Sequence, residues 1–358
     1  MRRPDIPVLT SLRFPAAFAI FLYHACPMVD LPRGLWGGLN EGVSFFYVLS
    51  GFILFYNYFD LPDRGDFWAA RLARIWPVHL ATLALALLVL PWPALWGSAW
   101  WPLVLPVNIF LLQAWAPFHY VTLSFNAVAW SLSVEAFFYF SFPWLCVWLK
   151  RWGPAPLLFG SFSLGAGLVI LAQAVSPRAA EVVAVFNPLC RGFEFILGMA
   201  TCHFWLRERT RPVGTTFGEL AASLLVLATL WLIARYGLTS GMALPGWLAT
   251  VVCAVEFAVV IWLFAHQTGW LSRAFSGRAF VLLGQISFSM YMCHQIVLRR
   301  FVTGLARTPE EKMAIFASCL AGTLVLSWLL FQLVETPMRH RIVGAYRAAR
   351  TKARSARR

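Results

Sequence analysis

Residues 155–175 read APLLFGSFSLGAGLVILAQAV, and none of these positions carries a charged side chain. A helix needs about 20 mostly apolar residues to cross the hydrocarbon core of a bilayer. This stretch is therefore predicted to be a transmembrane helix, and runs of similar character recur along the chain. The ten predicted spans are 9–29, 41–59, 76–93, 128–149, 155–175, 187–206, 217–235, 246–265, 279–298 and 312–333.

The composition supports the same fold class. Hydrophobic residues make up 60% of the 358 positions and charged residues only 12%, whereas a soluble domain carries roughly 25% charged residues. The 18 tryptophans and 31 phenylalanines suit aromatic belts at the two membrane surfaces. The predicted fold is an all-α, polytopic transmembrane helical bundle of about ten spans.

The distribution of basic residues predicts how the bundle is oriented. An eleventh apolar segment, 99–116, is interrupted by Pro102 and Pro106 and is predicted to be re-entrant or interfacial. If this segment does not cross, most basic loops, the pair Arg2 and Arg3, and the basic C-terminus all fall on one side. The positive-inside rule makes that side the cytoplasm, so we expect both termini to be cytoplasmic.

The net charge of +14 indicates an anionic binding partner. The basic residues lie between apolar runs and in the tail, where they suit anionic lipid headgroups better than nucleic acid. No linker separates two domains, so residues 1–342 are predicted to form one membrane domain. Residues 343–358 are predicted to be a basic cytoplasmic tail.

Arg13 and His24 are ionisable residues within the first predicted span. A charge inside the membrane is costly, and its presence there suggests function. The eleven-residue spacing places both side chains on one helix face, about 16 Å apart along the axis. An arginine suits a phosphate group and an imidazole suits proton transfer, so the pair matches an extended molecule such as acyl-coenzyme A. In the alternative interpretation, Arg13 extends to the headgroups and His24 bonds a neighbouring helix.

Glu135 lies at a depth comparable to that of His24. A carboxylate beside an imidazole could hold its tautomer and stabilise its charged form. In the alternative, Glu135 is a structural carboxylate satisfied by Ser131, Ser133 or an arginine.

Five further residues are candidates for a site or for structure. Arg191 and Glu194 are spaced i, i+3 and can pair on one helix, either as a structural ion pair or as a substrate contact. His294 is either a second acid–base group or a helix-packing residue. Arg71 and Arg74 lie at the predicted inner surface, where they either bind phosphate or are ordinary positive-inside arginines.

Several other chemistries have no support. The chain has no HExxH, CxxC, Walker or GxSxG motif, and the scattered histidines do not predict a metal site. The seven cysteines lie in apolar surroundings and are expected to be free thiols. The small residues of segment 42–51 predict close helix packing.

Seven motifs in order resemble the membrane-bound acyltransferase family 3, the bacterial O-acyltransferases, over about 8–342. They are Leu12-Arg13 leading to Tyr23-His24, GVSFFYVLSGF (42–52), RLARIWP (71–77), WSLSVE (130–135), RGFEFILG (191–198), LGQISFSMYMCH (283–294) and ETP (335–337). Mild departures from the family pattern are Ala136, Phe288 and Cys293.

The resemblance implies a multipass enzyme of the bacterial inner membrane. It implies that an acyl group, usually acetyl, moves from cytoplasmic acyl-CoA (acetyl-CoA) to a hydroxyl of a carbohydrate or glycosylated acceptor, with no permanently bound cofactor. By motif match His24 and Glu135 take catalytic places, and Arg13, Arg71 and Arg74 handle the donor. Further residues of the matched motifs are substrate or structural candidates: Tyr139, Arg191, Glu194, Tyr291 and His294.

A membrane transporter or flippase of a glycan or lipid-linked substrate is the alternative function. Intramembrane charges also line translocation paths. The absence of an internal repeat and the ordered motifs disfavour this alternative.

Overall fold

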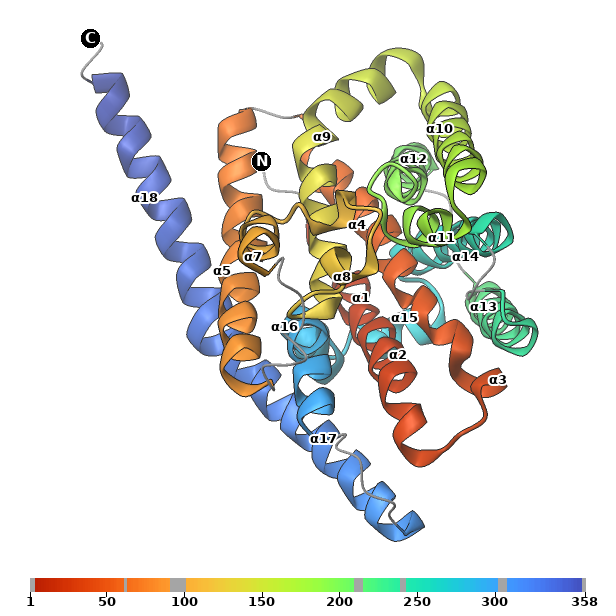
Figure 1. Ribbon diagram of the computed structural model, residues 1–358. Coiled ribbons are helices and arrows are strands. Elements are labelled where there is room, and N and C mark those ends of the chain that lie inside the picture. The colour runs from red at the N-terminus through yellow and green to blue at the C-terminus, as the bar shows by residue number, and fades with distance from the viewer. Residues whose placement is uncertain are drawn as a thin grey trace.

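A computed structural model describes residues 4–60, 63–90, 101–208, 215–238, 243–301 and 308–355. Within these ranges the regular elements are all helical (Figure 1). Nine of the described helical stretches are long and apolar enough to cross a membrane. The predicted all-α, polytopic bundle is therefore confirmed. The N-terminal pair Arg2 and Arg3, used in the orientation argument, lies outside the described residues.

Most helices follow the predicted spans closely. The exception is the predicted span 76–93, where the helix begins at Arg64 and where residues 91–93 lie outside the described residues. The one predicted span that is not among these nine stretches is 187–206, which corresponds to a helix with 17 described residues, slightly fewer than a full span. Segment 99–116 is described only from residue 101, and the described part contains nine residues in a helix, Trp101–Ile109. The elements are α1 (Pro7–Ser11), α2 (Arg13–Ala25), η1 (Cys26–Val29), α3 (Arg33–Trp36), η2 (Gly37–Glu41), α4 (Gly42–Tyr58), α5 (Arg64–Val89), α7 (Trp101–Ile109), η3 (Gln113–Trp115), α8 (His119–Thr122), η4 (Ala127–Ala129), α9 (Trp130–Trp152), α10 (Pro154–Val175), α11 (Pro177–Phe186), α12 (Gly192–Glu208), α13 (Thr216–Tyr236), α14 (Ala243–Ala265), α15 (Trp270–Phe275), α16 (Arg278–Phe301), α17 (Pro309–Leu330), η5 (Phe331–Glu335) and α18 (Thr336–Ser355).

Local sequence signals set several of the helix ends. The side chain of Asp63 accepts the backbone N–H of Asp66 and caps α5. Thr308 and Glu311 form a capping box at the start of α17. Gly153 adopts φ of 76° between α9 and α10, a conformation that favours glycine.

The helix α4 packs closely against α12. A Cβ atom added at Gly51 would collide with the carbonyl oxygen of Phe195, and one added at Gly198 would collide with that of Val48. Only glycine allows the two backbones to come this near. The close packing predicted from the small residues of 42–51 is confirmed, and it fixes α4 in the centre of the bundle.

The C-terminal helices run along one side of the molecule (Figure 1). The helix α17 continues through the single π-helical turn η5 into α18, which lies beside α5 (Figure 1). Arg350 of α18 pairs with Asp63 at 2.5 Å and with Asp66 at 2.6 Å. The backbone N–H of Asp66, together with the charge of Arg350, holds the pKa of the Asp63 carboxyl below its usual value. We call the end of the bundle at which Arg350 meets Asp63 and Asp66 the α18 end.

Candidate active site

One cavity collects most of the residues that the sequence singled out. Arg13 begins α2, whereas Arg71 and Arg74 lie in the first turns of α5, and all three line this cavity. We call it the arginine cavity. Its wall also includes Ser50, Ser131, Glu135, Tyr139, Ser287, Phe288 and Tyr291.

The charges around the arginine cavity are unbalanced. Among the described residues, three arginines face it against the single carboxylate of Glu135. Just beyond the lining, Glu335 lies within electrostatic range of Arg13 and Arg74, and Arg339 within range of Arg71 and Arg74. The surplus of positive charge makes the cavity suitable for an anion.

Glu135 occupies a different place from the one expected. It accepts a hydrogen bond from the Tyr139 hydroxyl one helical turn further along α9 and one from Ser50 at 3.4 Å. No contact joins Glu135 to His24 among the described residues, and the two side chains line different cavities. The expected carboxylate–imidazole pairing is therefore not formed. Trp130, five residues earlier on α9, lines the same cavity as His24, so Glu135 lies about 7.5 Å further along the helix, toward the arginines and not at the depth of His24.

The partner of His24 is a second histidine. His294 is fully buried on α16, and its Nε2 lies 3.1 Å from Nδ1 of His24. Nδ1 of His294 lies 2.6 Å from the carbonyl oxygen of Tyr291, and Nδ1 of His24 lies 3.0 Å from that of Ile20. Sequence reasoning left open whether His294 packs or does chemistry, and the spacing gave no sign of this pairing.

These contacts define the tautomers of both rings. A carbonyl oxygen only accepts hydrogen bonds, so Nδ1 of His294 carries the proton and donates it to the backbone carbonyl oxygen of Tyr291. In the neutral ring Nε2 of His294 then accepts, and the N–H at Nδ1 of His24 is shared between that atom and Ile20. The free lone pair of neutral His24 is therefore on Nε2, to which no described group donates a hydrogen bond.

His24 lines a second cavity at the other end of α2. This cavity has a volume of about 340 Å³ and is lined by residues of α2, α9, α11 and α16, among others. We call it the histidine cavity. The side chains of Val43 and Tyr291 line both this cavity and the arginine cavity. The eleven residues from Arg13 to His24 correspond to about 16 Å of helix, so α2 contributes one ionisable group to each.

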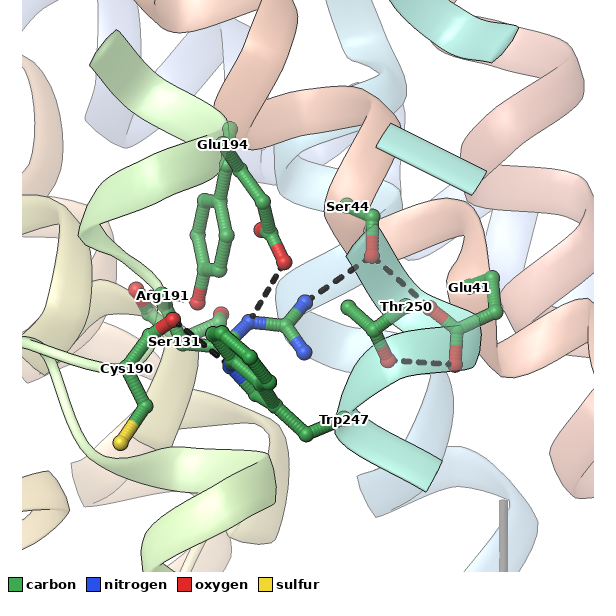
Figure 2. A network of polar contacts seen from close by, with 9 residues as sticks. Glu41, Ser44, Ser131, Cys190, Arg191, Glu194, Trp247 and Thr250 are labelled. Carbon is green, nitrogen blue, oxygen red and sulfur yellow. Dashed lines mark hydrogen bonds and ion pairs between the residues drawn. The ribbon is translucent and has the colours of Figure 1, made fainter. Parts of the chain in front are cut away.

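Arg191 and Glu194 belong to a separate buried network (Figure 2). Nε of Arg191 lies 3.1 Å from Glu194, and Nη2 donates to Ser44 at 3.0 Å. Ser44 in turn donates to Glu41 at 2.9 Å, and Thr250 also donates to Glu41 at 3.3 Å. The network ties α12 to α4, η2 and α14.

This network favours the structural interpretation of Arg191 and Glu194. Both side chains are almost fully buried, with exposed fractions of 4% and 2%. The guanidinium of Arg191 also lies over the rings of Tyr47 and Trp130. Neither charged residue lines the arginine or the histidine cavity.

Glu335 belongs to the ETP motif noted in the sequence, whereas three polar residues near these sites were missed: Arg339, Glu41 and Gln295. Glu335 accepts a hydrogen bond from Ser289 at 2.9 Å, and Arg339 lies one turn further along the helix. Their i, i+4 spacing in ETPMR was a usable signal. Glu41, just before the small-residue motif, and Gln295, directly after His294, had no comparable signal.

Comparison with known proteins gives concordant results. A family model described as "Acyltransferase domain" matches residues 6–332. The chain is 30% identical to "Acyltransferase MdmB" of Streptomyces mycarofaciens, with 97% of this chain and 94% of that protein covered. No solved structure matches the chain.

Two further relatives are longer than this chain. "Peptidoglycan O-acetyltransferase OatA" of Listeria monocytogenes is 24% identical over 94% of this chain and 56% of its own length. A "Putative O-acetyltransferase" of Staphylococcus aureus (strain COL) is 25% identical over 93% of this chain and 57% of its own. The chain therefore spans little more than half of these two relatives.

Proposed function

This chain belongs to the family of the acyltransferase domain that matches residues 6–332, and we propose that it moves an acetyl group from acetyl-CoA to a hydroxyl of a carbohydrate or glycosylated acceptor. It is a multi-pass membrane enzyme. Family membership therefore sets aside the transporter or flippase alternative. The acyl-CoA donor, the carbohydrate acceptor and the roles of individual residues are our proposal.

The observation that carries the proposal is the placing of three arginines in one cavity. Arg13, Arg71 and Arg74 come from two helices and face a space to which the described part of the chain contributes one carboxylate. Guanidinium groups bind phosphate oxygens through paired N–H donors. The phosphates of coenzyme A would be held here, with the thioester directed along α2 toward Val43 and Tyr291.

His24 is proposed to act as general base at the far end of α2. Its Nε2 takes the proton of the acceptor hydroxyl while that oxygen attacks the thioester carbonyl carbon. The tetrahedral intermediate collapses, the C–S bond breaks, and the proton passes from Nε2 to the departing sulfur. The products are the acetyl ester and free coenzyme A thiol, so protons and electrons balance.

Glu135 is proposed to act from the donor side. It receives hydrogen bonds from Tyr139 and Ser50 and faces the arginines. A carboxylate in this position orients the guanidinium groups and limits their mutual repulsion. Because the donor is cytoplasmic, the α18 end with the arginine cavity is proposed to face the cytoplasm of the inner membrane, together with both termini.

Transfer of labelled acetyl groups tests the proposal. The purified protein would be incubated with acetyl-labelled acetyl-CoA and with fractions of surface polysaccharide and glycosylated metabolites from a deletion strain. We expect alkali-labile label in at least one fraction. The variant His24→Ala should reduce transfer by about 10²–10⁴-fold, as loss of a general base does, at an unchanged melting temperature.

Two results would reject the proposal. One is the absence of label in every fraction although the purified protein is folded. The other is undiminished transfer by His24→Ala, which would remove the imidazole from the mechanism.

A further inference from the structure

The histidine cavity has the dimensions of a ligand site. Its volume of about 340 Å³ falls in the range of roughly 300–1,000 Å³ found for small-molecule sites. Tyr23 and His24 of α2, Trp130 of α9, Glu181 of α11 and Gln295 of α16 contribute to its wall. These residues are distant in sequence, so the cavity is a product of the tertiary fold.

Gln295 gives the cavity an unsatisfied hydrogen-bond acceptor. Its side-chain oxygen is buried and has no hydrogen-bond partner among the described residues. A buried polar atom without a partner is unfavourable. Because the residue lines the cavity that His24 also lines, a bound molecule with hydroxyl groups would supply the missing donor.

The charged groups of the cavity wall balance one another. Glu181 and Arg33 both line it, and the described residues form no ion pair or hydrogen bond with the Glu181 carboxylate. One acidic and one basic side chain give no net preference for a charged ligand. Both form hydrogen bonds with hydroxyl groups, which donate to a carboxylate and accept from a guanidinium. The histidine cavity thus differs from the arginine cavity, where positive charge predominates.

Aromatic rings complete the wall. Trp130 and Tyr23 both line the cavity, and flat apolar rings pack well against the C–H face of a sugar. A site with aromatic surface and a few convergent polar groups is typical of small-ligand recognition. Taken with the unpaired amide and the balanced charges, this composition suits a neutral, hydroxyl-rich ring.

We propose that the histidine cavity is the acceptor site and takes an uncharged sugar ring. Glu181 and Gln295 hold ring hydroxyls, Trp130 packs on the ring, and one hydroxyl reaches Nε2 of His24. The donor and the acceptor then approach from opposite ends of α2 and meet beside Val43 and Tyr291, which line both cavities. This inference rests on the proposed function and adds to it the place and charge class of the acceptor.

Two substitutions test the acceptor site, each with a matched control. Glu181→Gln removes the carboxylate charge, and Glu310→Gln removes one from the exposed start of α17. Gln295→Leu removes the amide, and Gln173→Leu removes an exposed one from α10. The assay uses the fraction labelled in the acetyl-transfer experiment. The amount of this fraction is varied at saturating acetyl-CoA, and acetyl-CoA is then varied at a saturating amount of the fraction.

We expect the two cavity variants to raise the apparent KM for the acceptor fraction by about tenfold. The KM for acetyl-CoA should stay unchanged in the two cavity variants, and both KM values should stay unchanged in the two controls. An unchanged acceptor KM in both cavity variants would overturn the inference, as would an equal rise in the KM for acetyl-CoA. If no fraction accepts label at all, the proposed function fails first, so the two failures are distinguishable.

Competition by small glycosides tests the charge class. Methyl glucoside, methyl glucosaminide and methyl glucuronide present the same ring with neutral, positive and negative charge. We expect methyl glucoside to inhibit labelling of the acceptor fraction most strongly. Stronger inhibition by either charged glycoside would overturn the assignment of an uncharged ring.

Discussion

At the scale of single residues, the contact between His24 and His294 is the most informative feature. A general base must present an unprotonated nitrogen to its substrate, and neutral imidazole can carry its proton on either nitrogen. Three contacts favour the form of His24 in which Nδ1 carries the proton and Nε2 is free. They involve the carbonyl oxygens of Ile20 and Tyr291 and the ring of His294. His294 is thus a positioning residue for the proposed base.

Replacing His294 should affect turnover more than donor binding. In His294→Leu the N–H of His24 keeps only Ile20 as a partner. A hydrogen bond contributes about 0.5–1.5 kcal/mol, and about 1.4 kcal/mol corresponds to tenfold in rate. We expect kcat to fall by about tenfold with the KM for acetyl-CoA unchanged, measured by release of coenzyme A thiol.

The variant His294→Gln is the conservative comparison. Its amide can donate to Tyr291 and accept from His24, so it should recover much of the activity. If the leucine and glutamine variants lose kcat equally and both melt at lower temperature, His294 has only a packing role.

At the scale of elements, the contact between α4 and α12 holds the centre of the bundle. Gly51 and Gly198 let the two backbones touch, and the Arg191 network joins the same two helices. The helix α4 also contributes Val43 and Ser50 to the arginine cavity. A shift of α4 against α12 would therefore disturb the site.

The variant Gly198→Ala tests this close packing. The added methyl group would meet the carbonyl oxygen of Val48, a backbone atom that moves only with its helix. Overpacking of this kind costs about 1–3 kcal/mol, so we expect a lower melting temperature in detergent.

Gly160→Ala on α10 is the matched control. A methyl group there meets nothing within 4 Å, and alanine favours a helix over glycine. The melting temperature should be kept or raised. Equal melting temperatures for the two variants would mean that the α4–α12 contact is not a tight one.

At the scale of the whole molecule, the proposed donor site combines helices from both ends of the chain. Arg13 comes from α2, Arg71 and Arg74 from α5, and Arg339 from α18, which lies beside α5. The long C-terminal helix therefore places an additional positive charge near the arginine cavity.

Arg339→Gln should weaken binding of acetyl-CoA. Exposed charge pairs contribute up to about 1 kcal/mol, so we expect Kd to rise by about fivefold, and by less at high salt because the charges are screened. The measurement is calorimetric titration of the purified protein. Arg341→Gln, which removes an exposed arginine from the same helix, is the control. Equal affinities in the two variants would separate α18 from the donor site.

The sequence alone determined the fold class and the main candidates for the site. Charge-free runs of bilayer length leave little alternative to membrane-spanning helices. The cost of burying charge made Arg13, His24 and Glu135 conspicuous. Helical periodicity predicted that Arg13 and His24 share one face of one helix. In the structure both residues belong to α2, with Arg13 at its start and His24 near its end.

Only the tertiary structure decided which of these residues meet. Glu135 faces the arginines, His24 pairs with His294, and Arg191 joins a separate network. Periodicity describes each helix separately, whereas these contacts depend on how helices rotate and slide against one another when they pack. That arrangement is set by many weak contacts across the bundle, and a single sequence does not express them as a pattern.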